Sequence, residues 1–160
     1  MRKLIGFGNL ANDAPWVWQT PFLKREHLSS VYFTDEKTGY AVGWEGTILK
    51  TNNSGLNWIA KSRERPFNWI VKSRKKTIDL YSVYFTDANT GYAVGWEGTI
   101  MKTIDAGNNW TFQTSGTLQN LLSIYFTDAN TGYAVGTGGA IIKTSNGGIN
   151  WTAQTSGTTN

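Results

Sequence analysis

Short stretches in which β-forming apolar and aromatic residues alternate with polar ones follow one another along much of this chain, separated by turn-forming Gly, Asn and Asp. Alternation with a period of two residues is typical of half-buried β-strands, and these turn residues favour tight connections between antiparallel strands. In the middle of the chain four such stretches follow in order: residues 81–86, 92–95, 99–103 and 110–114. The pattern predicts four antiparallel strands within about 40 residues.

One segment of 16 residues occurs three times. Its copies occupy residues 28–43, 80–95 and 121–136. The second and third copies are 41 residues apart, whereas the first precedes the second by 52 residues, because Asn57–Ser62 is echoed at Asn68–Ser73. A partial fourth copy is indicated by Trp16–Thr20, which aligns with the strand predicted at 110–114. The chain is therefore built from internal repeats.

Four strands in about 40 residues is the size of one blade of a β-propeller. A single twisted sheet of this kind has two apolar faces, which are buried only when neighbouring sheets stack against it. The sequence therefore predicts an all-β fold with three complete four-stranded antiparallel blades plus one N-terminal strand. The expected units are an N-terminal segment 1–27 with a partial blade strand at 16–20, and blades at 28–79, 80–120 and 121–160. Because about four blades are needed to close a propeller, we expect head-to-tail association of copies to complete the ring, the alternative being an open arc.

A second motif lies in the turn between the third and fourth predicted strands of each repeat. The middle repeat fits the pattern Thr-x-Asp-x-Gly-x-x-Trp, and the other two have Asn in place of Asp. The motif residues are Thr51, Asn53, Gly55 and Trp58; Thr103, Asp105, Gly107 and Trp110; and Thr144, Asn146, Gly148 and Trp151. With the Phe-Thr-Asp-x-x-Thr-Gly-Tyr-Ala-Val-Gly segment before it, the chain resembles the BNR/Asp-box β-propellers, and among them the photosystem II stability/assembly factor type of repeat. The resemblance implies a propeller that works by binding, has no chemistry of its own, and is commonly secreted or on the lumenal or periplasmic side of a membrane.

The Asp-box can be interpreted in two ways. A carboxylate beside a glycine turn is an available acceptor for a ligand or a metal. Asn in two of the three copies suits a hydrogen-bonding role better than a charge-dependent one. We therefore expect the Asp-box residues to be structural, with each Trp packed between neighbouring sheets.

The net charge of +4 is concentrated in one short segment. Residues 61–76 hold seven Lys and Arg against one Glu, whereas residues 77–160 carry a net charge of −3. This basic segment also contains aromatic residues, which favours contact with a protein partner. The predicted contact residues are Arg63, Arg65, Trp69, Arg74, Lys75 and Lys76. The alternative is that the charges only keep an exposed edge strand soluble, and nucleic acid is not an expected partner because the rest of the chain is slightly acidic.

The hairpin tips Trp44-Glu45 and Trp96-Glu97 occupy the same position in the first two repeats, and the third repeat has Thr137-Gly138 there. An aromatic ring beside a carboxylate could stack on a sugar ring and accept hydrogen bonds from its hydroxyl groups. The alternative is that both indoles cover the edge of a neighbouring sheet. We take Trp44, Glu45, Trp96 and Glu97 as the candidate ligand contacts.

Catalytic constellations are not recognisable. The chain has no cysteine, so thiolate nucleophiles and Cys-based metal sites are excluded. A sialidase-like site needs several converging arginines, and residues 77–160 contain none. His27 is the sole histidine and no Gly-x-Ser-x-Gly motif accompanies it. The carboxylates outside the repeated turns show no diagnostic spacing: Asp13, Glu26, Glu64 and Asp79.

The sequence thus predicts a non-enzymatic binding or assembly scaffold without cofactor or metal, in which copies associate and a protein partner is bound. The alternative is a carbohydrate-binding, lectin-like propeller or an inactive glycosidase-related module. No apolar run is long enough to span a bilayer and no clear signal peptide is recognised. A periplasmic or extracellular location follows only from the family resemblance.

Overall fold

The computed structural model describes residues 27–61 and 78–158. These residues form three four-stranded antiparallel sheets, in each of which the strands lie side by side in chain order. Sheet 1 contains β1 (Leu28–Phe33), β2 (Gly39–Gly43), β3 (Ile48–Thr51) and β4 (Ile59–Ala60). Sheet 2 contains β5 (Leu80–Phe85), β6 (Gly91–Gly95), β7 (Ile100–Thr103) and β8 (Thr111–Gln113). Sheet 3 contains β9 (Leu121–Phe126), β10 (Gly132–Gly136), β11 (Ile141–Thr144) and β12 (Thr152–Gln154).

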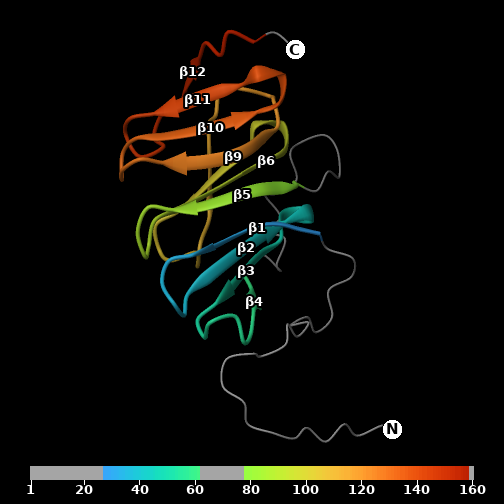
Figure 1. Ribbon diagram of the computed structural model, residues 1–160, viewed down its shortest axis with the longest axis vertical. Coiled ribbons are helices and arrows are strands. Elements are labelled where there is room, and N and C mark those ends of the chain that lie inside the picture. The colour runs from blue at the N-terminus through green and yellow to red at the C-terminus, as the bar shows by residue number, and fades with distance from the viewer. Residues whose placement is uncertain (1–26, 62–77, 159–160) are drawn as a thin grey trace, which may run out of the picture.

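The three sheets are stacked one on the next, from sheet 1 near the N-terminal end to sheet 3 near the C-terminal end (Figure 1). The first strands β1, β5 and β9 are the edge strands of their sheets, and they lie next to one another along one side of the stack. This arrangement confirms the predicted all-β fold of propeller blades. The N-terminal strand predicted at 16–20 lies outside the described residues.

The first strand of each sheet carries a β-bulge that sets which side chains are buried. In β5 the register against β6 shifts between Leu80 and Ser82. Because strand side chains alternate between faces, the extra residue brings Leu80 onto the same face as Val83 and Phe85, and all three are buried. The simple alternation expected from the sequence holds only after the bulge.

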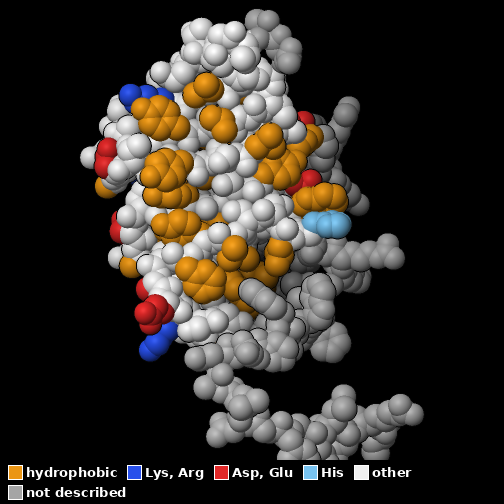
Figure 2. Space-filling view, viewed as in Figure 1, with side chains coloured by type: hydrophobic (Ala, Val, Ile, Leu, Met, Phe, Trp, Pro, Cys, Tyr) orange, Lys and Arg blue, Asp and Glu red, His pale blue; other side chains and the backbone are white. Residues whose placement is uncertain are grey.

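Two apolar cores lie between the sheets, and they are built from equivalent residues. Between sheets 1 and 2, Tyr40 stacks on Phe85 with ring centroids 4.0 Å apart, and between sheets 2 and 3 Tyr92 stacks on Phe126 at 4.2 Å. The first strands β1, β5 and β9 add a row of tyrosines, in which the Tyr84 ring lies 5.1 Å from that of Tyr32 and 5.2 Å from that of Tyr125. Hydrophobic side chains are accordingly visible along the whole face that carries β1, β5 and β9 (Figure 2).

A polar contact between sheets, which the sequence analysis missed, accompanies each core. The hydroxyl of Tyr40 and the ammonium of Lys50 both donate to the carbonyl of Ala106, at 2.9 and 2.7 Å. Tyr92 and Lys102 donate in the same way to the carbonyl of Gly147, at 2.8 and 2.6 Å. We call this arrangement the Tyr–Lys clamp: a Tyr and a Lys of one sheet hold a carbonyl in the Asp-box turn of the next. Burial raises the pKa of Tyr40 and of Tyr92 to about 12, so both hydroxyls remain donors at neutral pH.

Candidate functional site

The oxygens of the Asp-box are used within their own turns. In sheet 2, Thr103 Oγ1 donates to Asp105 Oδ1 at 2.8 Å, and the backbone N–H of Asn109 donates to the same carboxylate at 2.8 Å. The pKa of Asp105 is lowered to about 2, mainly because its carboxylate accepts hydrogen bonds from the backbone and the side chain of Asn109. Asn53 and Asn146 accept the equivalent backbone bonds at 2.9 and 3.0 Å. An amide oxygen therefore makes the same backbone contact as the carboxylate.

In sheets 2 and 3 the Asp-box tryptophan lies against the phenylalanine that ends the first strand of the same sheet. The ring centroids are 6.1 Å apart for Trp110 and Phe85 and 6.0 Å apart for Trp151 and Phe126, both edge to face. Trp110 packs against the core between sheets 1 and 2, and Trp151 belongs to the core between sheets 2 and 3. In the described part of the chain the Nε1 atoms of these two indoles are buried without a hydrogen-bond partner. The contacts they make are therefore apolar.

The hairpin tips are single 3₁₀ turns, and those of sheets 1 and 2 contact the start of the next sheet. They are η1 (Trp44–Gly46), η3 (Trp96–Gly98) and η4 (Thr137–Gly139). The backbone N–H of Glu45 donates to Asp79 Oδ1 at 3.1 Å, and that of Glu97 donates to Asn120 Oδ1 at 3.0 Å. These bonds place the two Trp-Glu pairs at equivalent positions along one side of the stack. We call this side the rim.

The side chains of the rim are partly exposed and acidic. Trp44 is 46% exposed and its ring lies 4.3 Å from that of His27, whereas Trp96 is half-buried. Glu45 and Glu97 are exposed. The rim can therefore offer an indole face and carboxylates to a ligand.

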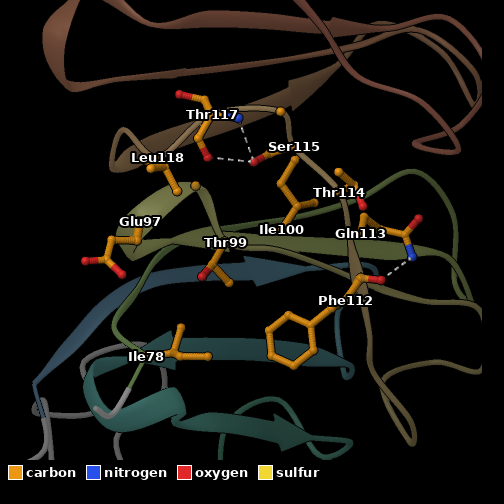
Figure 3. Close-up of a pocket in the computed structure, with 12 residues that line it drawn as sticks. Ile78, Glu97, Thr99, Ile100, Phe112, Gln113, Thr114, Ser115, Thr117 and Leu118 are labelled. Carbon is orange, nitrogen blue, oxygen red and sulfur yellow. Dashed lines mark hydrogen bonds between the residues drawn. The ribbon is translucent and has the colours of Figure 1, made fainter. Parts of the chain in front are cut away.

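A groove of about 510 Å³ adjoins the tip at Glu97 (Figure 3). Its apolar lining includes Ile78, Phe112 and Leu118, and its polar lining includes Ser115 and Thr117. Phe112 is 48% exposed and Leu118 is 84% exposed. In Figure 3 the carboxylate of Glu97 points away from Phe112 and Ile78. The groove thus has apolar walls with an acidic group at its mouth.

Sequence reasoning did not identify this groove. A signal was present, because the position of Phe112 is occupied by Ala60 in the first repeat and by Ala153 in the third. A large apolar side chain that replaces a repeated alanine and stays exposed is a candidate for binding. Repeat comparison by residue size, in addition to residue pattern, would have singled out Phe112.

The basic segment lies largely beyond what the structure describes. Its predicted contacts Arg63, Arg65, Trp69, Arg74, Lys75 and Lys76 are outside the described residues. Lys61, at the start of the segment, donates from its Nζ to Asn108 Oδ1 at 3.1 Å. This bond connects the end of sheet 1 to the Asp-box turn of sheet 2.

Most of the residues considered for catalysis lie outside the part of the chain that the structure describes. All five arginines, together with Asp13, Glu26 and Glu64, lie outside the described residues. His27 contacts Trp44, and Asp79 accepts the N–H of Glu45. Within residues 27–61 and 78–158, no group of three or more His, Cys, Asp or Glu side chains could hold a metal ion. The same ranges contain no helix long and apolar enough to cross a membrane.

Solved structures with the same architecture include members of two groups of proteins. A structure of YCF48 bound to D1 peptide superposes with a TM-score of 0.66 at 24% identity, covering 80% of this chain and 40% of that one. YCF48 from Cyanidioschyzon merolae gives a TM-score of 0.64 at 26% identity, covering 83% of this chain and 38% of that one. A GH74 enzyme from Niastella koreensis shares the fold at 17% identity and a TM-score of 0.57, covering 79% of this chain and 22% of that one. The chain therefore spans about two fifths of the length of the YCF48 structures.

The sequence gives a second, independent comparison. No curated protein matches it. The family model described as photosynthesis system II assembly factor YCF48 matches residues 10–112, which is more than half of the chain. This match, with the three blades and their Asp-box turns, shows that the chain belongs to the YCF48 family of photosynthesis system II assembly factors.

Proposed function

We propose that the chain is a non-enzymatic binding module that recruits a protein partner through the rim and the adjoining groove. The observation that carries the proposal is the groove of about 510 Å³, in which the exposed rings and methyl groups of Phe112 and Leu118 lie beside the tip at Glu97. Exposed apolar side chains in a concave surface are typical anchors for a partner side chain. A YCF48 structure that holds a D1 peptide supports a peptide as the kind of partner.

The charges around the groove indicate the chemistry of that partner. Glu45 and Glu97 are exposed, and Asp79 lies beside the tip at Glu45. An apolar side chain that enters the groove and a neighbouring Lys or Arg that faces the rim would complement this surface. The basic segment 61–76 is a second proposed contact, suited to an acidic surface on the same partner.

Truncation of Phe112 tests the main proposal. We expect Phe112→Ala to weaken binding of a D1 peptide at least about tenfold in a calorimetric titration, because truncation of a central apolar anchor typically costs about 2 kcal/mol or more and about 1.4 kcal/mol is already a factor of ten. The matched control is Ile149→Ala, which truncates a side chain that is 71% exposed and lies outside the groove. Equal affinity of the two variants, or no binding to the unmodified chain, would contradict the proposal.

Carbohydrate binding is the second candidate function, favoured by the exposed face of Trp44 beside Glu45. A glycan array followed by oligosaccharide titration of Trp44→Ala separates it from peptide binding. If the site is lectin-like, the Trp44→Ala variant should lose its glycan signal but keep its affinity for the peptide, which binds through the groove at Phe112. Absence of any glycan signal from the unmodified chain removes this candidate.

We also propose that the blades are the units 28–79, 80–120 and 121–160, and that the binding form of the chain is self-associated. Each unit would then contain one of the three sheets and its connecting loop. Self-association would cover the two outer faces of the stack, since propeller blades bury their apolar faces against neighbours.

A further inference from the structure

Sheet 3 exposes residues whose counterparts are buried in the other two sheets. We call the side of a sheet that carries the Tyr and Lys of the clamp its front face. Val135, on the front face of sheet 3, is 42% exposed, whereas the equivalent Val42 and Val94 are 0% exposed. Tyr133 and Lys143 keep the clamp arrangement, with Nζ 5.5 Å from the ring centroid, as in Lys50 over Tyr40 at 5.3 Å. The front face of sheet 3 is therefore formed as in the two internal interfaces.

Sheet 1 exposes the opposite half of the same interface. We call the side that receives the clamp the back face. Val31 and Phe33, on the back face of sheet 1, are 59% and 44% exposed, while the equivalent Phe85 and Phe126 are each 2% exposed. The residues left open on this face are thus the ones that meet a neighbouring sheet elsewhere in the chain.

The Asp-box turn of sheet 1 has the backbone of the two turns that receive a tyrosine ring. A Cβ atom added to Gly107 would lie 2.7 Å from the ring of Tyr40, and one added to Gly148 would lie 2.8 Å from the ring of Tyr92, so both glycines allow a close approach of the ring. Gly55 has the same left-handed backbone, with φ of +81°. The turn of sheet 1 is therefore built like the two turns that accept a clamp.

We propose that the front face of sheet 3 docks onto the back face of sheet 1 in a second copy of this chain. In this interface Tyr133 Oη and Lys143 Nζ donate to the carbonyl of Ser54 of the second copy. Ser54 is the repeat equivalent of Ala106 and Gly147, whose carbonyls receive the two internal clamps, and its φ of 58° compares with 56° and 64° for those residues. The inference rests on the self-association part of the proposed function and is independent of the groove.

Continuity with the two internal interfaces identifies the second copy as the occupant. The same side chains meet the same turn twice within the chain, so a third contact of this type requires no new chemistry. The contact is head to tail, because the front face of one copy meets the back face of the next. Each added copy leaves one front and one back face free, and association continues until a ring closes or a filament forms.

Two charged substitutions test the proposal. Val135→Glu places a carboxylate on the front face of sheet 3, and Val31→Glu places one on the back face of sheet 1. Sedimentation velocity at micromolar concentrations should show an oligomer for the unmodified chain and a monomer for each variant alone. A 1:1 mixture should form a dimer, because Val31→Glu retains its front face and Val135→Glu retains its back face. The matched control is Ile104→Glu, which adds the same charge at a side chain that is 73% exposed in an Asp-box turn, and it should associate like the unmodified chain.

Several outcomes would overturn the inference. A monomeric unmodified chain would show that the open faces serve another occupant, such as a different protein or further blades. Continued association of Val135→Glu, or a mixture that stays monomeric, would exclude head-to-tail contact through these faces. Far-UV circular dichroism and urea unfolding of each variant establish that it is folded. Titration of the D1 peptide into Val135→Glu separates this result from the groove: retained peptide binding by a monomer leaves partner recognition intact whatever the state of association.

Discussion

Asp105 is the one carboxylate in the three Asp-box turns, and it differs from its Asn counterparts in being able to titrate. Its pKa is lowered from 3.8 to about 2 because Asn109 donates to the carboxylate from its backbone and its side chain. A carboxyl group with a lowered pKa in the folded state stabilises the fold above its unfolded pKa, and this contribution disappears as the pH falls toward the folded value. The turn of sheet 2 should therefore weaken between pH 3.8 and about pH 2.

We expect Asp105→Asn to reduce the dependence of the free energy of unfolding on pH in this window. Urea unfolding at a series of pH values measures the effect. Some dependence should remain, because backbone hydrogen bonds also lower the pKa of Asp35 and of Asp128. The reverse change Asn146→Asp is the matched control and should increase the slope. Equal slopes in all three proteins would show that the carboxylate has the same pKa folded and unfolded.

At the level of strands and turns, the Tyr–Lys clamp is the element that joins one sheet to the next. Its carbonyl acceptor lies in a turn whose backbone is left-handed, and the following glycine allows the tyrosine ring to approach closely. The clamp therefore needs both the strand residues of one sheet and the Asp-box turn of its neighbour.

We expect Tyr40→Phe to lower the free energy of unfolding by about 1 kcal/mol, because the bond to Ala106 is lost and the ring contacts remain. Tyr133→Phe removes the equivalent hydroxyl from the open front face of sheet 3. Measured in the Val135→Glu background, which excludes association, it should change the free energy of unfolding by only a few tenths of a kcal/mol. Similar losses in both variants would mean that the hydroxyl acts within its own sheet.

The strands could be predicted from the sequence, but the contacts between sheets only in part. The stretch predicted at 81–86 forms β5 one residue earlier, because the bulge between Leu80 and Ser82 shifts the alternation. The clamp was missed even though Tyr and Lys are ten residues apart in every repeat, as in Tyr92 and Lys102. A lysine recurring inside a strand indicates a fixed partner, but its acceptor is a backbone carbonyl, which leaves no trace in side-chain patterns.

The groove beside Glu97 could not be predicted from the repeat pattern. It depends on Ile78, Phe112 and Leu118, which are residue types that the equivalent positions of the other repeats do not share and which meet only in the folded chain. The hairpin tips, in contrast, follow from the repeat, so their equivalent positions could be predicted. The repeated residues therefore predict the structural features that the three sheets share, whereas residues that differ between repeats mark features that only one sheet has.

At the scale of the whole molecule, and among the residues that the structure describes, sheet 2 packs against a neighbouring sheet on both faces and sheets 1 and 3 on one face each. In a stack held by nearest-neighbour contacts the central unit opens last. β6 and β10 have the same sequence, Gly-Tyr-Ala-Val-Gly, so their intrinsic amide exchange rates are matched.

We expect the amides of β6 to exchange more slowly with deuterium than those of β10 in the monomeric Val31→Glu variant. Hydrogen exchange followed by mass spectrometry measures the two strands in one experiment. In the unmodified chain, exchange in β10 should become slower as the protein concentration rises, because association covers sheet 3. Equal protection of β6 and β10 in the monomer would show that the chain opens as one unit.

The identical clamps at the two internal junctions have a consequence for how such a gene can change. Because each sheet presents the same donors on one side and the same turn on the other, a duplicated 41-residue unit meets a ready-made neighbour wherever it is inserted. Lengthening or shortening the protein by whole units then needs no compensating substitutions at the junctions. Selection can then act on the hairpin tip and the groove of each unit separately while the number of units changes.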